Sequence, residues 1–171
     1  MKQTLIDYIK RGAFDELYTP NYAIAPLLKY LPKRKITIWE CTDFGSSNIT
    51  KVLKDNGYEV ITTHKDSFDF LNDTPNFDFD MIVTNPPYSL KDEFLKKCYE
   101  YNKPFCLLLP ITALEGIERG GLYRKYGLEL LVLDTRINFM ESKKSCWFNT
   151  SWFCHNVLPK QLIFEHLEKE K

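Results

Sequence analysis

Residues 80–88 read Asp-Met-Ile-Val-Thr-Asn-Pro-Pro-Tyr, and this stretch decides the kind of fold that the sequence encodes. Its first part, residues 81–84, is a short run of apolar and β-branched residues, which is typical of a buried strand. The two prolines that follow fix two φ angles and remove two backbone N–H donors, so the strand cannot continue past Asn85. The sequence therefore predicts a buried strand that ends in a rigid turn carrying Asn85 and Tyr88.

Strands and helices alternate on both sides of this stretch. The hydrophobic pattern predicts further strands over residues 36–41, 58–63, 104–109, 128–133 and 151–157, the last of these being the final strand. It predicts helices over residues 20–31, 48–56, 89–101, 114–126 and 160–170, with irregular segments over residues 66–79 and 135–149. Because this alternation favours βαβ crossovers, we predict an α/β fold with a mostly parallel sheet that helices cover on both faces.

Length and composition limit the class of protein. The chain has 171 residues, 44% of them hydrophobic and 27% charged, which favours one globular domain over residues 1–171. Residues 1–17 are expected to be an N-terminal lead, either an amphipathic helix or a partly ordered arm. The sequence has no apolar run of about 20 residues and no signal-peptide core at its start, so we expect a cytoplasmic protein without a membrane span.

The charged residues, cysteines and histidines exclude further classes. Lys plus Arg and Asp plus Glu both number 23, so the basic excess of a non-specific duplex-binding protein is missing. The five cysteines are odd in number and form no C-x-x-C pair, and the three histidines lack metal-ligand spacing. We therefore expect buried, reduced thiols, and neither a disulfide framework nor a metal site.

Two unusual segments, residues 40–48 and 84–89, both follow predicted strands. The carboxyl ends of parallel strands meet at one edge of a sheet, where such folds bind ligands. The Asn85 amide oxygen and the Pro86 carbonyl offer two acceptors, which match the two N–H donors of an exocyclic amine. Tyr88 adds a planar face for stacking a base. The alternative is a tight strand-to-loop turn with a surface aromatic side chain.

Residues 80–88 resemble the catalytic motif of the N6-adenine DNA methyltransferases, which are S-adenosylmethionine-dependent amino-methyltransferases, and the similarity to small phage-encoded members extends over most of the chain. The resemblance implies a Rossmann-like class I methyltransferase fold with about seven strands. It also implies that the catalytic residues are Asn85, Pro86, Pro87 and Tyr88.

The same resemblance implies roles for residues outside the turn. Those expected to contact S-adenosylmethionine are Tyr18, Thr19, Pro20, Glu40, Asp43, Gly45, Asp69, Phe70 and Asn85. Those expected to contact the acceptor are Tyr88, Arg136 and Phe139, with Tyr88 and Phe139 on the two sides of a base flipped out of the DNA. The implied reaction is direct displacement, in which the exocyclic nitrogen attacks the cofactor's methyl group; it needs neither a metal nor a nucleophilic side chain.

The chain also departs from the resembled pattern. The glycine-rich cofactor loop keeps Gly45 but has Ser47 at the next small position, and Cys41 where proline is frequent. After the second strand, His64 lies where the family usually has an acidic residue for the cofactor ribose, and Asp66 follows two residues later. These departures leave open a binding protein on a methyltransferase scaffold.

The remaining alternatives concern the acceptor. An RNA adenine or a protein glutamine amide would suit the same turn. Only residues 111–126 and 135–149 are left to recognise a substrate, and no separate target-recognition domain is predicted. We therefore expect DNA that is single-stranded or read with low specificity, or a homodimer that builds a larger surface.

Purely structural interpretations of the site residues also exist. Glu40 and Asp43 would then be a strand-end charge and a helix cap, Asp69 and Phe70 would pack a loop, and Arg136 would form a loop ion pair. Trp147 or Phe148 could line the target pocket, but core packing is favoured for both.

Overall fold

The computed structural model describes residues 18–139 and 148–169, whose strands form one mixed sheet. The spatial order of the strands is β2-β1-β3-β4-β6-β5-β7. Neighbours among β2, β1, β3 and β4 are parallel, β6 is antiparallel to both β4 and β5, and β7 is parallel to β5. The strands are β1 (Thr37–Glu40), β2 (Glu59–Thr62), β3 (Met81–Thr84), β4 (Phe105–Pro110), β5 (Glu129–Leu133), β6 (Thr150–His155) and β7 (Leu162–Glu165). The predicted α/β fold and mostly parallel sheet are confirmed.

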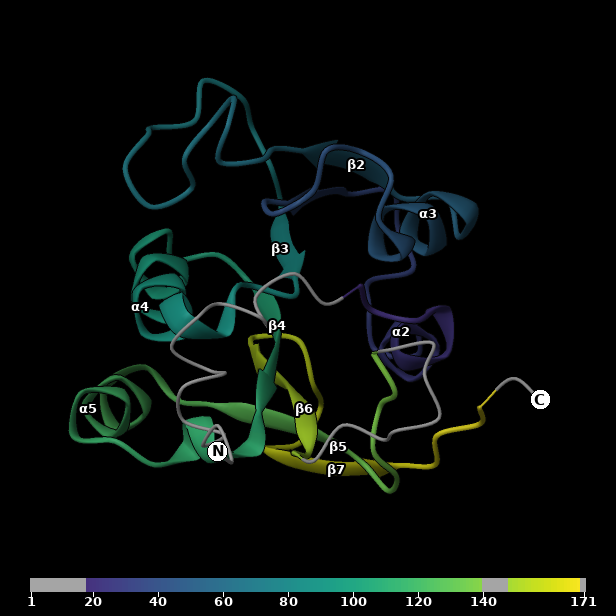
Figure 1. Ribbon diagram of the computed structural model, residues 1–171, viewed down its shortest axis with the longest axis vertical. Helices are drawn as coiled ribbons and strands as arrows, with labels where there is room; N and C mark the ends of the chain where they lie inside the picture. Colours follow the sequence, from purple (N-terminus) through teal and green to yellow (C-terminus); the bar gives the residue numbers. More distant parts are fainter. Residues whose placement is uncertain (1–17, 140–147, 170–171) are drawn as a thin grey trace, which may run out of the picture.

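Helices lie on both faces of this sheet (Figure 1). One face carries α2 (Asn21–Leu28) and α3 (Asn48–Asp55), and the other carries α4 (Lys91–Glu100) and α5 (Ile117–Tyr126). Short 3₁₀ turns, η1 (Tyr88–Leu90) and η2 (Ile111–Leu114), connect the carboxyl ends of β3 and β4 to the helices that follow. No helix in the described ranges is both long and apolar enough to cross a membrane.

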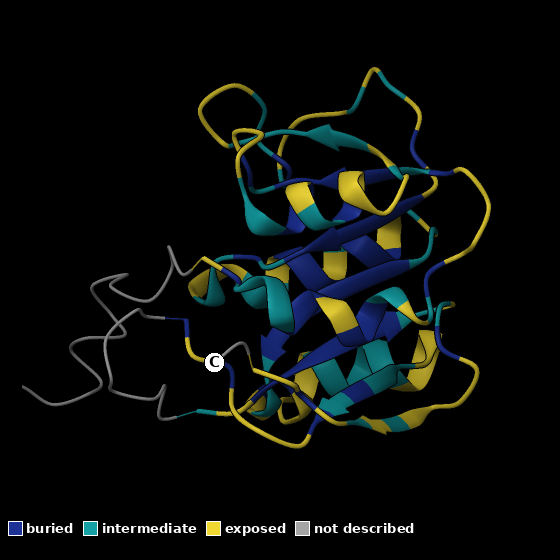
Figure 2. Cartoon of the chain, turned by 90° about the vertical axis from the view of Figure 1, so that its right-hand side faces the viewer, coloured by how far each residue is buried: buried dark blue, intermediate teal, exposed yellow. Residues whose placement is uncertain are grey.

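The core is built on both faces because side chains alternate along each strand. Ile38 of β1 packs with Ile24 and Leu27 of α2, whereas its neighbour Trp39 points to the α4 face. Around Trp39, five aromatic rings lie with centroids 4.9–5.7 Å away, among them Phe70 and Phe79. Figure 2 shows the central strands buried and the outermost segments exposed. The long connection between β2 and β3 therefore contributes much of the α4-side core although it has no regular structure.

Helix α3 forms where its sequence signals predict it. The Ser47 hydroxyl accepts a hydrogen bond from the Thr50 N–H at 3.1 Å, which caps the first turn. Ile49 and Leu53 are buried on one face of the helix. Gly57, with φ of +87°, follows the helix end in the left-handed region that glycine adopts most readily.

One predicted element is wrong. Residues 160–170 were expected to form a terminal helix and residues 151–157 the last strand, but Leu162–Glu165 form a seventh strand, β7. The Leu130 N–H donates to the Gln161 carbonyl at 2.8 Å, and the Asp134 N–H donates to the Glu165 carbonyl at 3.1 Å. Glu165 also accepts hydrogen bonds from Lys29 at 2.6 Å and Tyr30 at 2.5 Å. Tertiary pairing thus overrides the local helix propensity of the charged end. The N-terminal lead, residues 1–17, lies outside the described residues.

Candidate functional site

The candidate site lies at the carboxyl ends of β1, β2 and β3, which are parallel neighbours and so end at one edge of the sheet. Strand β3 is buried throughout and ends at Thr84. Pro86 is buried, and Asn85 and Tyr88 are half-buried. The Leu90 N–H donates to the Pro87 carbonyl at 2.9 Å, which closes the 3₁₀ turn before α4 begins. The prolines thus end the strand and hold the Asn85–Tyr88 turn between β3 and α4, as predicted.

Asp43 organises the loop after β1. Its carboxylate accepts hydrogen bonds from the N–H groups of Ser46 at 3.2 Å and Ser47 at 3.0 Å, and from the Thr50 hydroxyl at 2.6 Å. Burial raises the pKa of this carboxyl, but the hydrogen bonds from Thr50 and the backbone N–H groups outweigh burial and lower it. Gly45 has φ of +103°, a conformation that this tight loop requires and that glycine tolerates. The Asp43 carboxylate is therefore engaged in shaping its own loop.

Residues 18–20 lie against the same loop. The Asn48 side chain donates to the Thr19 carbonyl at 2.9 Å, which ties this segment to the start of α3. Thr19 is buried, whereas Tyr18 is 73% exposed. The structure therefore places residues 18–20 beside the start of α3, which follows the Asp43 loop, and their role toward a cofactor stays a prediction.

Glu40 joins the β1 loop to the Asn85–Tyr88 turn. Its side chain is buried, with 1% of the residue exposed. The Glu40 Oε1 atom accepts from the Thr42 N–H at 3.1 Å, the Thr42 hydroxyl at 3.0 Å and the Thr84 hydroxyl at 2.5 Å. The Thr42 hydroxyl lies 3.4 Å from the Asn85 carbonyl oxygen. Burial raises the pKa of Glu40 to about 7, although the threonine hydrogen bonds lower it, and the Asp43 charge adds to the rise.

Aromatic side chains lie beside the turn. The Phe148 ring lies 5.7 Å from the Tyr88 ring at an interplanar angle of 76°, and 6.5 Å from the Phe139 ring at 28°. Tyr88 and Phe139 are therefore both neighbours of Phe148, a residue for which the sequence favoured core packing. The exposed Arg136 donates to the Asn149 side chain at 2.8 Å. The three predicted acceptor-binding residues are thus linked through Phe148 and Asn149.

Asp69 and Phe70 lie on the α4 face of the sheet. Phe70 is 2% exposed and its ring stacks on Phe94 at 4.8 Å. The Asp69 carboxylate accepts from the Leu71 N–H at 2.9 Å and the Asn72 side chain at 2.7 Å, so it stabilises its own turn. Hydrogen bonds from Asn72 and Leu71, with a smaller contribution from Lys97, lower the pKa of Asp69. The role of both residues toward a cofactor stays a prediction.

Comparisons with known proteins bear on the fold. No protein-family model matches the sequence, and neither does any curated protein. Among solved structures, the methyltransferase subunit of a type I restriction-modification system from Streptococcus thermophilus matches 94% of this chain, with a TM-score of 0.54 and 16% identity. A candidate class I S-adenosylmethionine-dependent methyltransferase from Listeria monocytogenes matches 96% of this chain, with a TM-score of 0.54 and 13% identity. The chain has the class I methyltransferase fold.

The extent of these matches differs. The chain spans 51% of the length of the Streptococcus thermophilus subunit and 72% of that of the Listeria monocytogenes protein. At 13–16% identity the likeness concerns the methyltransferase fold itself. The roles of individual residues must therefore be argued from the geometry of the candidate site at the carboxyl ends of β1, β2 and β3, which we call the rim.

Sequence reasoning missed several residues of the methyltransferase-fold rim. Phe44 is 71% exposed and stacks on His64, with centroids 3.7 Å apart. The pair joins the β1 loop to the end of β2. Thr42 and Thr84, which connect Glu40 to the turn, were also missed. The available signal was position, because Thr42, Phe44 and Thr84 each follow or end a predicted strand. The sequence had marked His64 only as a departure from the acidic residue of the resembled family.

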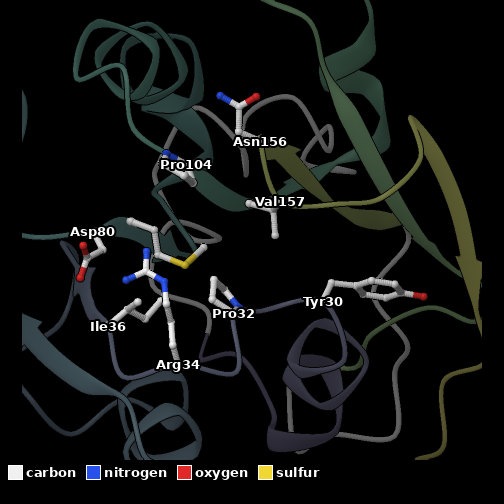
Figure 3. Close-up of a pocket in the computed structure, with 9 residues that line it drawn as sticks. Tyr30, Pro32, Arg34, Ile36, Asp80, Pro104, Asn156 and Val157 are labelled. Carbon is white, nitrogen blue, oxygen red and sulfur yellow. The ribbon is translucent and has the colours of Figure 1, made fainter.

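A separate cavity of about 130 Å³ lies at the other edge of the sheet (Figure 3). Its lining includes Arg34 and Ile36 before β1, Asp80 before β3, and Asn156 after β6. These positions are at the amino ends of β1 and β3, so the cavity is distinct from the candidate site. Among the described residues, no three His, Cys, Asp or Glu side chains gather in a way that could hold a metal ion.

We expect the Thr50→Val variant to unfold more easily at neutral pH, by about 1.5–3 kcal/mol, because it removes a hydrogen bond to a charged, buried partner. The folded-state pKa of Asp43 is lowered, so this stabilisation is present above its unfolded-state value and is lost as the pH falls through the folded-state value. Urea unfolding from pH 7 into the acid range measures the difference. Thr50→Ser, which keeps the hydroxyl, is the control; equal stability of Thr50→Val and wild type at pH 7 would contradict the assignment.

Glu40 has the opposite pH dependence. Its folded-state pKa is raised to about 7, so folding is favoured while the carboxyl is neutral in both states, and this stabilisation is lost as the pH rises from the unfolded-state value toward 7. Over that pH interval, we expect the free energy of unfolding of the wild type to fall by about 3 kcal/mol relative to that of Glu40→Gln. Urea unfolding of both proteins between pH 4.5 and 8 measures it, and parallel stability curves would disprove it.

Proposed function

We propose that the protein is an S-adenosylmethionine-dependent methyltransferase that methylates the exocyclic N6 of adenine in DNA. The observation that carries this proposal is the Asn85–Tyr88 turn, which lies at the carboxyl end of β3 in a methyltransferase fold, in contact with the β1 loop. An asparagine amide and a proline carbonyl, held by two prolines, are acceptors for the two N–H donors of an exocyclic amine. No metal is required by this chemistry.

The rim residues suit the proposed cofactor. Residues 18–20 lie beside the start of α3, which directly follows the Asp43–Ser47 loop. The exposed rings of Tyr18 and Phe44 offer apolar faces beside them. S-adenosylmethionine, when bound, supplies an electrophilic methyl group. We assign cofactor contacts to residues 18–20, the Asp43 loop and Asn85, and keep Glu40, Asp69 and Phe70 as candidates.

The chain's own residues then position the acceptor. Hydrogen bonds from the amine to the Asn85 side chain and the Pro86 carbonyl draw its nitrogen toward tetrahedral geometry, which directs its lone pair outward. Tyr88 stacks on one face of the base, and Phe139 is assigned to the other face, with Arg136 available for a phosphate. Catalysis of this kind depends on positioning and on oriented dipoles.

DNA is the acceptor that we favour. One protein of similar fold is the methyltransferase subunit of a restriction-modification system, and the Asn-Pro-Pro-Tyr sequence resembles the motif of the adenine DNA methyltransferases. We propose that this DNA is single-stranded or read with low sequence specificity, or that a second copy of the chain extends the binding surface.

The test is methylation with tritiated S-adenosylmethionine offered separately with single-stranded DNA, duplex DNA, RNA and denatured protein. We expect label in DNA, and mass spectrometry of the digested nucleosides identifies N6-methyladenine. Label in RNA adenine or in protein glutamine would show that the proposed acceptor is wrong and that the proposed methyl-transfer chemistry is right. Label in none of them would contradict the enzyme assignment.

A ligand-binding scaffold without methyl transfer is the second candidate. The observation that favours it is the Phe44–His64 stack, which occupies the end of β2 where the resembled family has a carboxylate. Calorimetric titration with S-adenosylmethionine distinguishes the two candidates. Micromolar binding supports the enzyme, and no binding at millimolar concentration supports the scaffold.

A further inference from the structure

A chain of hydroxyl groups runs from Glu40 to the Asn85 carbonyl. The Thr84 hydroxyl lies 2.5 Å from Glu40 Oε1, and 2.8 Å from the Thr42 hydroxyl. The Thr42 hydroxyl lies 3.0 Å from Glu40 Oε1 and 3.4 Å from the Asn85 carbonyl oxygen. Glu40 and Thr84 are buried. Two hydroxyl protons therefore serve more acceptors than they can satisfy at once.

The charge of Glu40 decides where these protons go. An ionised carboxylate is the strongest acceptor in the group, so both hydroxyls donate to Oε1 together with the Thr42 N–H. In that arrangement the Thr42 hydroxyl has no proton left for the Asn85 carbonyl.

A neutral Glu40 reverses the direction of the chain. Oε1 is then either a weaker acceptor or itself the donor of a proton to Thr84. In both cases Thr84 can donate to Thr42, and Thr42 to the Asn85 carbonyl. The proton lost on ionisation leaves for solvent, so the chain changes only its orientation. The Asn85–Pro86 peptide group is held by this hydrogen bond when Glu40 is neutral and is released when Glu40 is ionised.

We propose that Glu40 is a positioning residue for the Asn85–Tyr88 turn and acts on it through Thr84 and Thr42. Its effect on methyl transfer rests on the proposed function, whereas the coupling itself does not. Among the described residues, two ionisable groups interact electrostatically with Glu40: the Asp43 carboxylate, in the loop after β1, and the thiol of the neighbouring Cys41. Strand β3 contributes only the uncharged Thr84 to this group. The raised pKa of Glu40, about 7, places the change within the physiological range.

Nuclear magnetic resonance of the full ¹³C,¹⁵N-labelled chain tests the coupling without any ligand. We expect the Glu40 carboxyl carbon and the Asn85 carbonyl carbon to titrate with one shared midpoint. In Thr42→Val, Glu40 should still titrate while the Asn85 signal no longer follows it. Thr112→Val, at an exposed threonine of η2, is the matched control and should leave both titrations unchanged. An Asn85 carbonyl that ignores the Glu40 midpoint in the wild type would overturn the proposal.

Thr84 provides a second, independent variant pair. Thr84→Ser keeps the hydroxyl and should keep the shared midpoint, whereas Thr84→Val should abolish it. If Thr84→Ser and Thr84→Val behave alike, the chain does not carry the coupling.

Activity supplies a separate result. We expect kcat for methyl transfer to fall as the pH rises through the Glu40 midpoint, and Thr42→Val to lower kcat by roughly tenfold to a hundredfold and to make it independent of this ionisation. KM for S-adenosylmethionine should change little. If no acceptor is methylated but the two carbons still share a midpoint, the proposed function fails and the positioning proposal stands. If methylation proceeds but the two carbons do not share a midpoint, the positioning proposal fails and the proposed function stands.

Discussion

The Asn85→Ala variant is expected to lose methyl transfer by about 10²–10³-fold in kcat, because it removes a preorganised dipole from the reacting nitrogen. The fold should not change, since Asn85 lies beyond the last residue of β3 and the two prolines still form the turn. S-adenosylmethionine affinity should fall far less than kcat, because residues 18–20 and the Asp43–Ser47 loop still contact the cofactor. Loss of the acceptor oxygen therefore affects the chemical step more than binding.

Single-turnover methylation of DNA, together with calorimetric titration of S-adenosylmethionine, separates these two effects. Asn76→Ala is the matched control, because Asn76 is an exposed asparagine of the connection between β2 and β3. Asn85→Asp, which retains an acceptor oxygen, should keep more activity than Asn85→Ala. Equal turnover by Asn85→Ala and the wild type would exclude the proposed role of the turn.

The features that the sequence predicted correctly are those set by local chemistry. Two adjacent prolines have few conformations, so the end of β3 and the turn after it follow from the sequence alone. The same holds for the start of α3, where Ser47 caps the helix, and for its end at Gly57. The sequence also predicts that the carboxyl ends of β1 and β3 lie close together, because parallel strands end at the same edge of a sheet.

The features that were missed depend on partners far away in the sequence. Strand β7 forms because it pairs with the free edge of β5, which lies about 30 residues earlier in the chain. The local pattern of residues 160–170 does not predict this pairing. The environment of Glu40 depends on Thr84, which is 44 residues away. Phe148 lies between Tyr88 and Phe139 for the same reason. Loop contacts of this kind cannot be derived from spacing.

Phe70 is the residue for which the local and the three-dimensional interpretations differ most. The resemblance implied that it contacts the cofactor, yet its ring lies between Trp39 at 5.1 Å and Phe94 at 4.8 Å and is 2% exposed. We expect Phe70→Ala to lower the free energy of unfolding by about 3–5 kcal/mol, the range for a buried phenylalanine. Phe44→Ala, at a ring that is 71% exposed, should change it by less than about 0.5 kcal/mol.

Phe70→Leu separates a core role from a cofactor role. Leucine keeps most of the buried volume, so its cost in a urea unfolding experiment should be well below that of alanine. Leucine cannot stack on an adenine ring as phenylalanine can. If Phe70 only supports the core, S-adenosylmethionine affinity in Phe70→Leu equals that of the wild type. If the affinity falls while stability is retained, the ring takes part in binding, and the connection between β2 and β3 then forms one wall of the cofactor site as well as part of the core.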